Sequence, residues 1–132
     1  MSKNFATYDA CDTTVIIDGT YITGLGEDMI TGEKDEDFSS ESVGAQGDVV
    51  ENVINNPLGT VNIKIQSTSP QRKFMDSLAK RKDPFPLWCV NKKLNERFGG
   101  QKAKLKKWPS IERGTEADEL DYQFKVYDYT VE

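Results

Sequence analysis

Apolar and polar residues alternate along much of the chain, with the period of two that is typical of strands buried on one face. The clearest run is "GTVNIKIQST" (59–68), and the same period recurs in "LDYQFKVYDY" (120–129). In "QKAKLKKW" (101–108) lysines alternate with Ala103 and Leu105, so this segment is predicted to be a strand with one basic face. In the other two segments the buried face is expected to hold Val61, Ile63, Ile65, Leu120, Tyr122, Phe124 and Val126.

Further strand-like segments surround these three. The dipeptide Asp18-Gly19 accepts positive φ, so it predicts a tight hairpin between two short strands within 13–24. The remaining predicted strands are 28–34, 38–43, 48–54 and 85–94, and the predicted loops are 95–100 and 109–119.

One segment has a helical period. In "SPQRKFMDSLAKRKDP" Ser69 can serve as N-cap and Pro70 as the first helical residue, and Asp83-Pro84 ends the helix. Its apolar stripe consists of Phe74, Met75, Leu78 and Ala79. We therefore predict one α-helix over about 70–82.

About seven or eight short strands and one flanking helix predict a mainly β fold, either a barrel or a sandwich. The length of 132 residues fits a single domain, 1–132. The chain has no apolar run long enough to span a bilayer, and "MSKNFATYDACD" has no apolar core of a signal peptide, so we expect no membrane insertion and folding in the cytosol. In that compartment Cys11 and Cys89 are expected to be free thiols rather than a disulfide.

Composition argues against catalysis. The chain has no histidine, which removes the commonest general base and the commonest metal ligand. The acidic run Asp35-Glu36-Asp37 is read as a solvated turn rather than a cation site, because it lacks the glycine-centred spacing of a calcium loop. Trp88 and Trp108 are read as packing residues. No nucleophile–base pair can be argued, so we expect no enzyme, no cofactor and no metal.

Charge is unevenly distributed along the chain. Residues 1–63 have a net charge of −10 and residues 64–132 a net charge of +5, which gives −5 for the whole chain. Such segregation indicates either two solvated faces or a surface that binds a partner. The lysine-rich run beside Trp108 is compatible with nucleic-acid binding, but a pI near 4.8 opposes a dedicated nucleic-acid binder.

Segments 15–39 and 44–70 resemble the tail-tube proteins of contractile-tailed bacteriophages and phage-tail-like particles. The resemblance rests on "GAQGDV" (44–49), "NNPLGTVNIKI" (55–65) and "TSP" (68–70) at the start of a short helix. The C-terminal half matches only in its general order of strands. The haemolysin-coregulated protein of type VI secretion is similar to this family in fold.

The resemblance implies a structural subunit that forms six-fold rings, which stack into a hollow tube for the passage of double-stranded DNA. Its partners would be further copies of itself, the tail sheath, and baseplate or terminator proteins. Its location would be the virion tail, assembled in the cytoplasm of the host bacterium. An acidic first half that meets a basic second half across rings would set orientation and register. Acidic side chains facing the channel would keep DNA from adhering to the wall.

The resemblance also implies a long β-hairpin arm over about 38–56 that contacts the neighbouring ring, whereas an ordinary hairpin within one subunit is the alternative. The predicted interface residues are Phe38, Glu41, Val43, Gly44, Gly47, Asp48, Val49, Val50, Glu51, Asn52, Asn55 and Asn56. The candidate basic residues at ring contacts are Lys102, Lys104, Lys106 and Lys107. Two other functions stay open: a tube initiator or terminator of the same tail, and a monomeric β-sandwich module that binds a ligand.

Overall fold

The computed structural model describes residues 5–115 and 118–132, with the backbone alone at 26–28. Its strands are β1 (Thr13–Ile17), β2 (Thr20–Ile22), β3 (Leu25–Lys34), β4 (Ser39–Val43), β5 (Val49–Val53), β6 (Gly59–Gln66), β7 (Phe85–Asn91), β8 (Glu96–Lys107), β9 (Glu119–Val126) and β10 (Thr130–Val131). Its helices are α1 (Arg72–Ser77) and the 3₁₀ segments η1 (Ala10–Asp12) and η2 (Leu78–Lys80). The mainly β prediction is confirmed.

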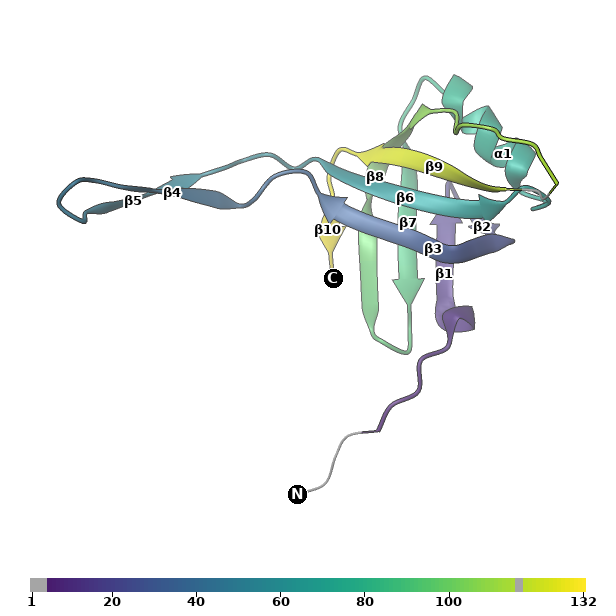
Figure 1. Ribbon diagram of the computed structural model, residues 1–132, viewed down its shortest axis with the longest axis horizontal. Coiled ribbons are helices and arrows are strands. Elements are labelled where there is room, and N and C mark those ends of the chain that lie inside the picture. The colour runs from purple at the N-terminus through teal and green to yellow at the C-terminus, as the bar shows by residue number, and fades with distance from the viewer. Residues whose placement is uncertain (1–4, 116–117) are drawn as a thin grey trace.

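Eight strands form one antiparallel sheet in the order β2-β1-β7-β8-β9-β6-β3, with β10 paired to the first part of β8. β2 and β3 stand at its two ends, so the sheet is not a closed barrel. Figure 1 shows β3, β6 and β9 lying across β1, β7 and β8, in the manner of two crossed layers. β4 and β5 form a separate hairpin that extends far from these layers (Figure 1).

The long strand β8 joins the two layers. Its residue pairing with β7 shifts between Phe85 and Leu87, and its pairing with β9 shifts between Leu105 and Lys107. Such irregularities bend a strand and increase its twist, which lets one sheet fold over itself. Gly99 lies in this bend with φ +133°, and a Cβ there would be 2.1 Å from the carbonyl oxygen of Leu87.

The core lies between the layers, and the alternation along the strands confirms its predicted faces. All seven aliphatic and aromatic positions predicted on β6 and β9 are buried. The rings of Phe85 and Phe124 meet edge to face at 6.1 Å, a favoured aromatic geometry. From the helical segment, Met75 and Leu78 are buried, and Phe74 and Ala79 pack against the cluster.

The helix is shorter than the predicted 70–82. The Ser69 hydroxyl donates to the carbonyl of Thr23 at 2.7 Å, which ties the segment to the end of β2, and accepts from Gln71 N at 3.3 Å, but the helix begins two residues later than Ser69 would place it. Gln71 takes the N-cap position without a side-chain cap bond. At the other end Arg81 is already extended, and its guanidinium pairs with Asp18 in the β1–β2 hairpin.

The predicted boundaries around β7 and β8 were also wrong. β7 ends at Asn91 rather than at residue 94, and β8 begins at Glu96, within the predicted loop 95–100. The Asn91 side chain is buried and accepts hydrogen bonds from the backbone N–H groups of Lys93 and Leu94, both at 3.0 Å. This Asx turn starts the reversal earlier than the apolar pattern indicates. The two-residue strand β10 was not predicted, and the described residues form ten strands, where about seven or eight were expected.

Candidate assembly site: a projecting arm and a cationic groove

The β4–β5 hairpin projects from the body as an arm (residues 38–56), with the boundaries that the sequence predicts. Its closing hydrogen bond runs from Ile54 N to Phe38 O at 2.9 Å. Along the two strands every side chain is exposed except Ser39, which is half-buried. The large apolar side chains are 59–77% exposed, and they are Phe38, Val43, Val49, Val50 and Val53. So much exposed apolar surface on one narrow element is typical of a binding segment.

The tip of the arm is a tight turn. Gly47 N donates to Gly44 O at 2.9 Å, and Gly44 N donates to Asp48 O at 2.8 Å. Gly47 has positive φ (+91°), which glycine adopts without strain. Gly44 has no positive φ, and it serves as the last residue before the turn.

Residue pairing assigns the arm two faces. Residues directly opposite each other in an antiparallel pair share a face, and successive residues alternate. One face carries the pairs Val43–Val49, Glu41–Glu51 and Ser39–Val53, and we call it the acidic face. Two carboxylates directly opposite each other repel, and neither has a cation within 4 Å among the described residues. The other face carries Phe38, Ser40, Ser42, Val50, Asn52 and Ile54.

Polar contacts fix the base of the arm. The Lys34 ammonium, at the end of β3, donates to the carbonyls of Glu36 at 2.9 Å and Asn56 at 2.8 Å. It also lies 4.9 Å from the centre of the Phe38 ring, within cation–π range. Across the base, Leu58 N donates to the Asn56 side chain at 3.0 Å. One lysine therefore holds both strands where they leave the body.

Asp35 strengthens this base. Its backbone N–H donates to Leu58 O at 3.1 Å, and its carboxylate accepts from the Thr60 hydroxyl at 2.7 Å and from the Lys125 ammonium. The pKa of Asp35 is lowered below its ordinary value, mainly by the hydrogen bond from Lys125 and to a smaller extent by the hydrogen bond from Thr60. The acidic run 35–37 is thus part of the base of the arm. Among the residues that the structure describes, no group of three potential ligands could hold a metal ion.

The predicted basic face of β8 exists. Ala103 and Leu105 are buried, Lys104 is half-buried, and Lys102, Lys106 and Lys107 are exposed. Lys104 lies directly opposite Lys125 of β9, so the cations are concentrated where the two strands meet.

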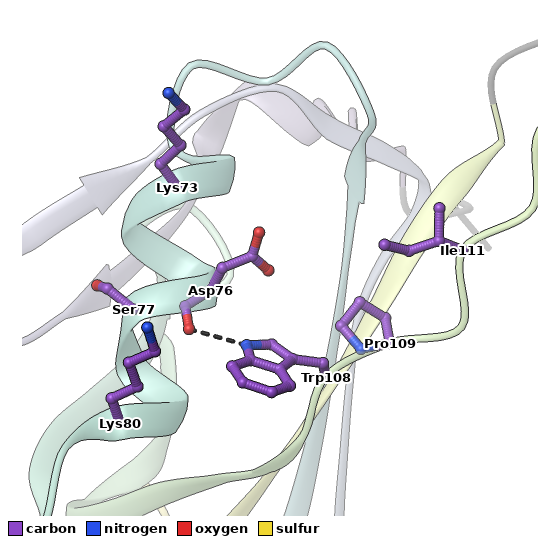
Figure 2. Close-up of a pocket in the computed structure, with 7 residues that line it drawn as sticks. All are labelled: Lys73, Asp76, Ser77, Lys80, Trp108, Pro109 and Ile111. Atoms are coloured by element: carbon purple, nitrogen blue, oxygen red, sulfur yellow. Dashed lines mark hydrogen bonds between the residues drawn. The ribbon is translucent and has the colours of Figure 1, made fainter.

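A groove beside α1 is a feature that sequence reasoning missed. Its volume is about 530 Å³, and its lining residues are Lys73, Asp76, Ser77, Lys80, Trp108, Pro109 and Ile111. Figure 2 shows Trp108, Pro109 and Ile111 facing the helix, with Lys73 and Lys80 spaced along it. The Trp108 indole N–H donates to Asp76 O at 3.0 Å, which fixes the ring across the groove.

The groove is apolar along its loop side and cationic along its helix side. Trp108 and Ile111 are 55% and 57% exposed, so Trp108 is not buried as a packing residue of the core would be. The Asp76 carboxylate is engaged by the Tyr122 hydroxyl at 2.5 Å and lies 4.0 Å from Arg72. Lys73 and Lys80 have no carboxylate within 4 Å in the described part of the chain, so the groove has a net positive rim.

The remaining candidates have structural explanations. Trp88 is half-buried, and the Arg97 guanidinium lies 3.7 Å from the centre of its ring. Both cysteines are free thiols; Cys11 is exposed, whereas Cys89 is buried, and burial raises the pKa of its thiol to about 12. No helix in the described residues is long and apolar enough to cross a membrane.

The chain belongs to the family described as the Bacteriophage PhiTE tail tube protein, whose sequence profile matches residues 6–128. The tail-tube resemblance is thereby confirmed, and the family is structural rather than enzymatic.

The fold has a counterpart among solved structures. A cryo-electron-microscopy structure of the anti-feeding prophage cap, described as the tube-terminating cap, superimposes with a TM-score of 0.70. The similarity covers 99% of this chain and 95% of the cap chain at 8% sequence identity, so it concerns the fold alone. A comparison with curated protein sequences gives no match.

Proposed function

We propose that the chain is the repeating subunit of a phage tail tube, in which six-fold rings stack into a hollow conduit for double-stranded DNA. The observation that carries the proposal is the arm, which projects from the body (Figure 1) and leaves the side chains of Val43, Val49, Val50 and Val53 59–69% exposed. An exposed hairpin of this kind is an aggregation hazard unless it has a defined partner. Membership of the tail-tube family supplies the context in which that partner is a neighbouring copy.

The arm is the proposed contact between rings, through the residues from Phe38 to Asn56. Its base is braced by Lys34 and Asp35, so its direction is set by the body rather than by the partner. A fixed direction supports a contact that repeats from ring to ring, because an interface that does not close on itself generates an open filament. The β8 lysines (Lys102, Lys104, Lys106 and Lys107) are also proposed to contribute to ring contacts. They would do so by long-range electrostatic attraction to acidic residues of a neighbouring copy.

Charge supports the same arrangement. Residues 35–56, the arm with its base, carry six carboxylates and no cation, whereas the rest of the chain has a net charge of +1. The difference in net charge between the two halves of the sequence is therefore mainly a difference between an acidic arm and a nearly neutral body. On this proposal most of these carboxylates lie at contacts between copies rather than on the channel wall.

The proposed location is the virion tail, after assembly in the host bacterial cytoplasm. The proposed partners are further copies of the chain, the sheath of a contractile tail, and the baseplate and terminator proteins that bound the tube. Family membership supports a tail location.

Negative-stain electron microscopy of the purified protein over a concentration series tests the proposal. Hollow tubes of uniform diameter are the expected result. Single rings that do not stack would instead indicate the tube terminator, the alternative within the same tail. A protein that stays monomeric throughout would favour the ligand-binding module, for which the groove beside Trp108 would be the site to examine.

A further inference from the structure

The acidic face of the arm needs a receiving surface with a particular chemistry. Its two carboxylates lie between the pair Val43–Val49 toward the tip and Val53 toward the base. Successive rows on one face of a strand are roughly 7 Å apart. A complementary surface must therefore offer cations for the carboxylates and apolar area for the valines within a short distance.

The groove beside α1 has this combination. Trp108, Pro109 and Ile111 supply apolar surface, and Lys73 and Lys80 supply cations that have no carboxylate within 4 Å among the described residues. The two lysines are seven residues apart, which on a helix corresponds to roughly 10 Å along the axis. The two lysine side chains, both on the helix side of the groove, are flexible enough for each to reach one carboxylate of an inserted hairpin.

We infer that the groove lined by Lys73, Lys80 and Trp108 receives the acidic face of the arm from a second copy of this chain. The inference rests on the proposed tube function and assigns the receiving site within it. The pairing places Glu41 and Glu51 against Lys73 and Lys80, and it places the valines against Trp108 and Ile111. It relieves the repulsion between the two opposed carboxylates, neither of which has a cation within 4 Å in the described part of the chain.

The occupant is a second copy because both halves of the contact belong to one sequence but lie at opposite ends of the molecule. In Figure 1 the arm extends to the left, and α1 lies at the right-hand side of the body. A chain cannot insert its own arm, so each copy offers one arm and one groove. Such a head-to-tail contact repeats without closing on itself, as a stacked tube requires.

The β8 lysines fit the arm less well. Their surroundings on the neighbouring strands are polar, with Gln123 and Lys125 on β9 and Asn62 on β6. That surface supplies cations, and its apolar area lies at one end, where Trp108 and Pro109 line a second groove with Asn62, Lys107 and Asp121. The Asp121 carboxylate would repel the carboxylates of the arm there. It is the competing site that an experiment has to exclude.

Charge reversal in one chain tests the pairing. Glu41→Lys/Glu51→Lys and Lys73→Glu/Lys80→Glu are each expected to raise the concentration needed for tube formation by roughly tenfold or more, because each places like charges in contact. The quadruple variant restores opposite charges in every contact and is expected to assemble near the wild-type concentration. The matched competitor combines the arm reversal with Lys102→Glu/Lys107→Glu, which is expected not to restore assembly. Circular dichroism of each variant verifies that the body is folded.

Photo-crosslinking locates the contact directly. Benzoylphenylalanine in place of Val49 on the acidic face is expected to crosslink to the peptide that contains Trp108 and Ile111 of another copy. The same label in place of Val50 on the other face is the control and is expected not to label that peptide. Rescue by the β8 reversal, or Val49 crosslinks to another surface or another tail protein, would overturn the groove assignment and leave the tube proposal intact. A wild-type chain that forms neither tubes nor rings would contradict the tube proposal itself.

Discussion

At the scale of single residues, several glycines mark places where another part of the chain approaches the backbone. Gly59 opens β6 next to the base of the arm, and a Cβ there would lie 2.3 Å from Cγ of Tyr129. Tyr129 is held in turn by a hydrogen bond from its backbone N–H to Pro57 O at 3.0 Å. The ring therefore braces the point where the chain returns from the arm to the body.

Gly59→Ala is expected to lower the free energy of unfolding by roughly 1–3 kcal/mol, because the new methyl group overpacks a site that cannot yield without moving Tyr129. Gly114→Ala is the matched control: no atom of the described residues lies within 4 Å of a Cβ at Gly114, and its φ is not positive. The control is expected to change stability by less than about 0.5 kcal/mol. Urea denaturation measures both, and equal stability of the two variants would refute the close packing at Gly59.

Asp35 predicts a pH dependence at the base of the arm. Its pKa is lowered from an ordinary value of 3.8, chiefly by the hydrogen bond from Lys125. A lowered pKa in the folded state means that the stabilisation is fully present above the ordinary value and is lost as the pH falls through the folded value. Asp35→Asn should therefore be less stable than wild type at pH 7, and the difference should shrink in acid. A constant difference from pH 7 down to pH 2 would contradict this assignment.

At the scale of elements, the sequence predicted those strands that bury one face. Val61, Ile63 and Ile65 alternate with polar residues because β6 has the core on one side and solvent on the other. The first half of β8 escaped prediction because Gly99-Gly100 has the composition of a loop, whereas glycine is needed at 99 for the approach of β7 and at 100 for the approach of Val126 and Asp128. The groove could not be predicted, since it brings Trp108 against Asp76, 32 residues away, without a local pattern.

The arm was predicted as a hairpin, but the alternation of buried and exposed positions could not predict it, because its strands have no buried face. It contributes little to the core, since its apolar residues are exposed and the core cluster lies within the crossed layers. The stability of the body should therefore not depend on the arm, as expected of an element whose packing partner is another copy in the assembly.

Replacement of residues 39–53 by a short glycine-serine linker is therefore expected to leave the body folded. Its melting temperature should stay within a few degrees of wild type, because no residue of the core cluster is removed. Tube formation should be lost. Calorimetry and electron microscopy on the same sample distinguish the two effects, and a truncated chain that still forms tubes would show that the arm does not carry the ring contact.

At the scale of the whole molecule, salt distinguishes two electrostatic effects of opposite sign. The net charge of −5 makes copies repel, and added salt would relieve that repulsion and favour assembly. The contact between arm and groove is attractive, and salt would weaken it. Because the chain outside residues 35–56 has a net charge of only +1, the bodies contribute little general repulsion. The short-range attraction is therefore expected to dominate.

The critical concentration for tube formation should accordingly rise between about 50 and 500 mM NaCl, a range over which the screening length falls from more than 10 Å to a few Å. Glu41→Gln/Glu51→Gln removes the arm carboxylates while keeping the shape of the side chains, so its critical concentration should respond less to salt. Sedimentation of tubes at each salt concentration gives both curves. A wild-type critical concentration that falls with salt would mean that general repulsion outweighs the arm, and the carboxylates would then serve solubility before assembly rather than recognition. Apolar contact of the valines with Trp108 persists at high salt in either case, so the slope of the curve reports the charges and its high-salt limit reports the apolar surface.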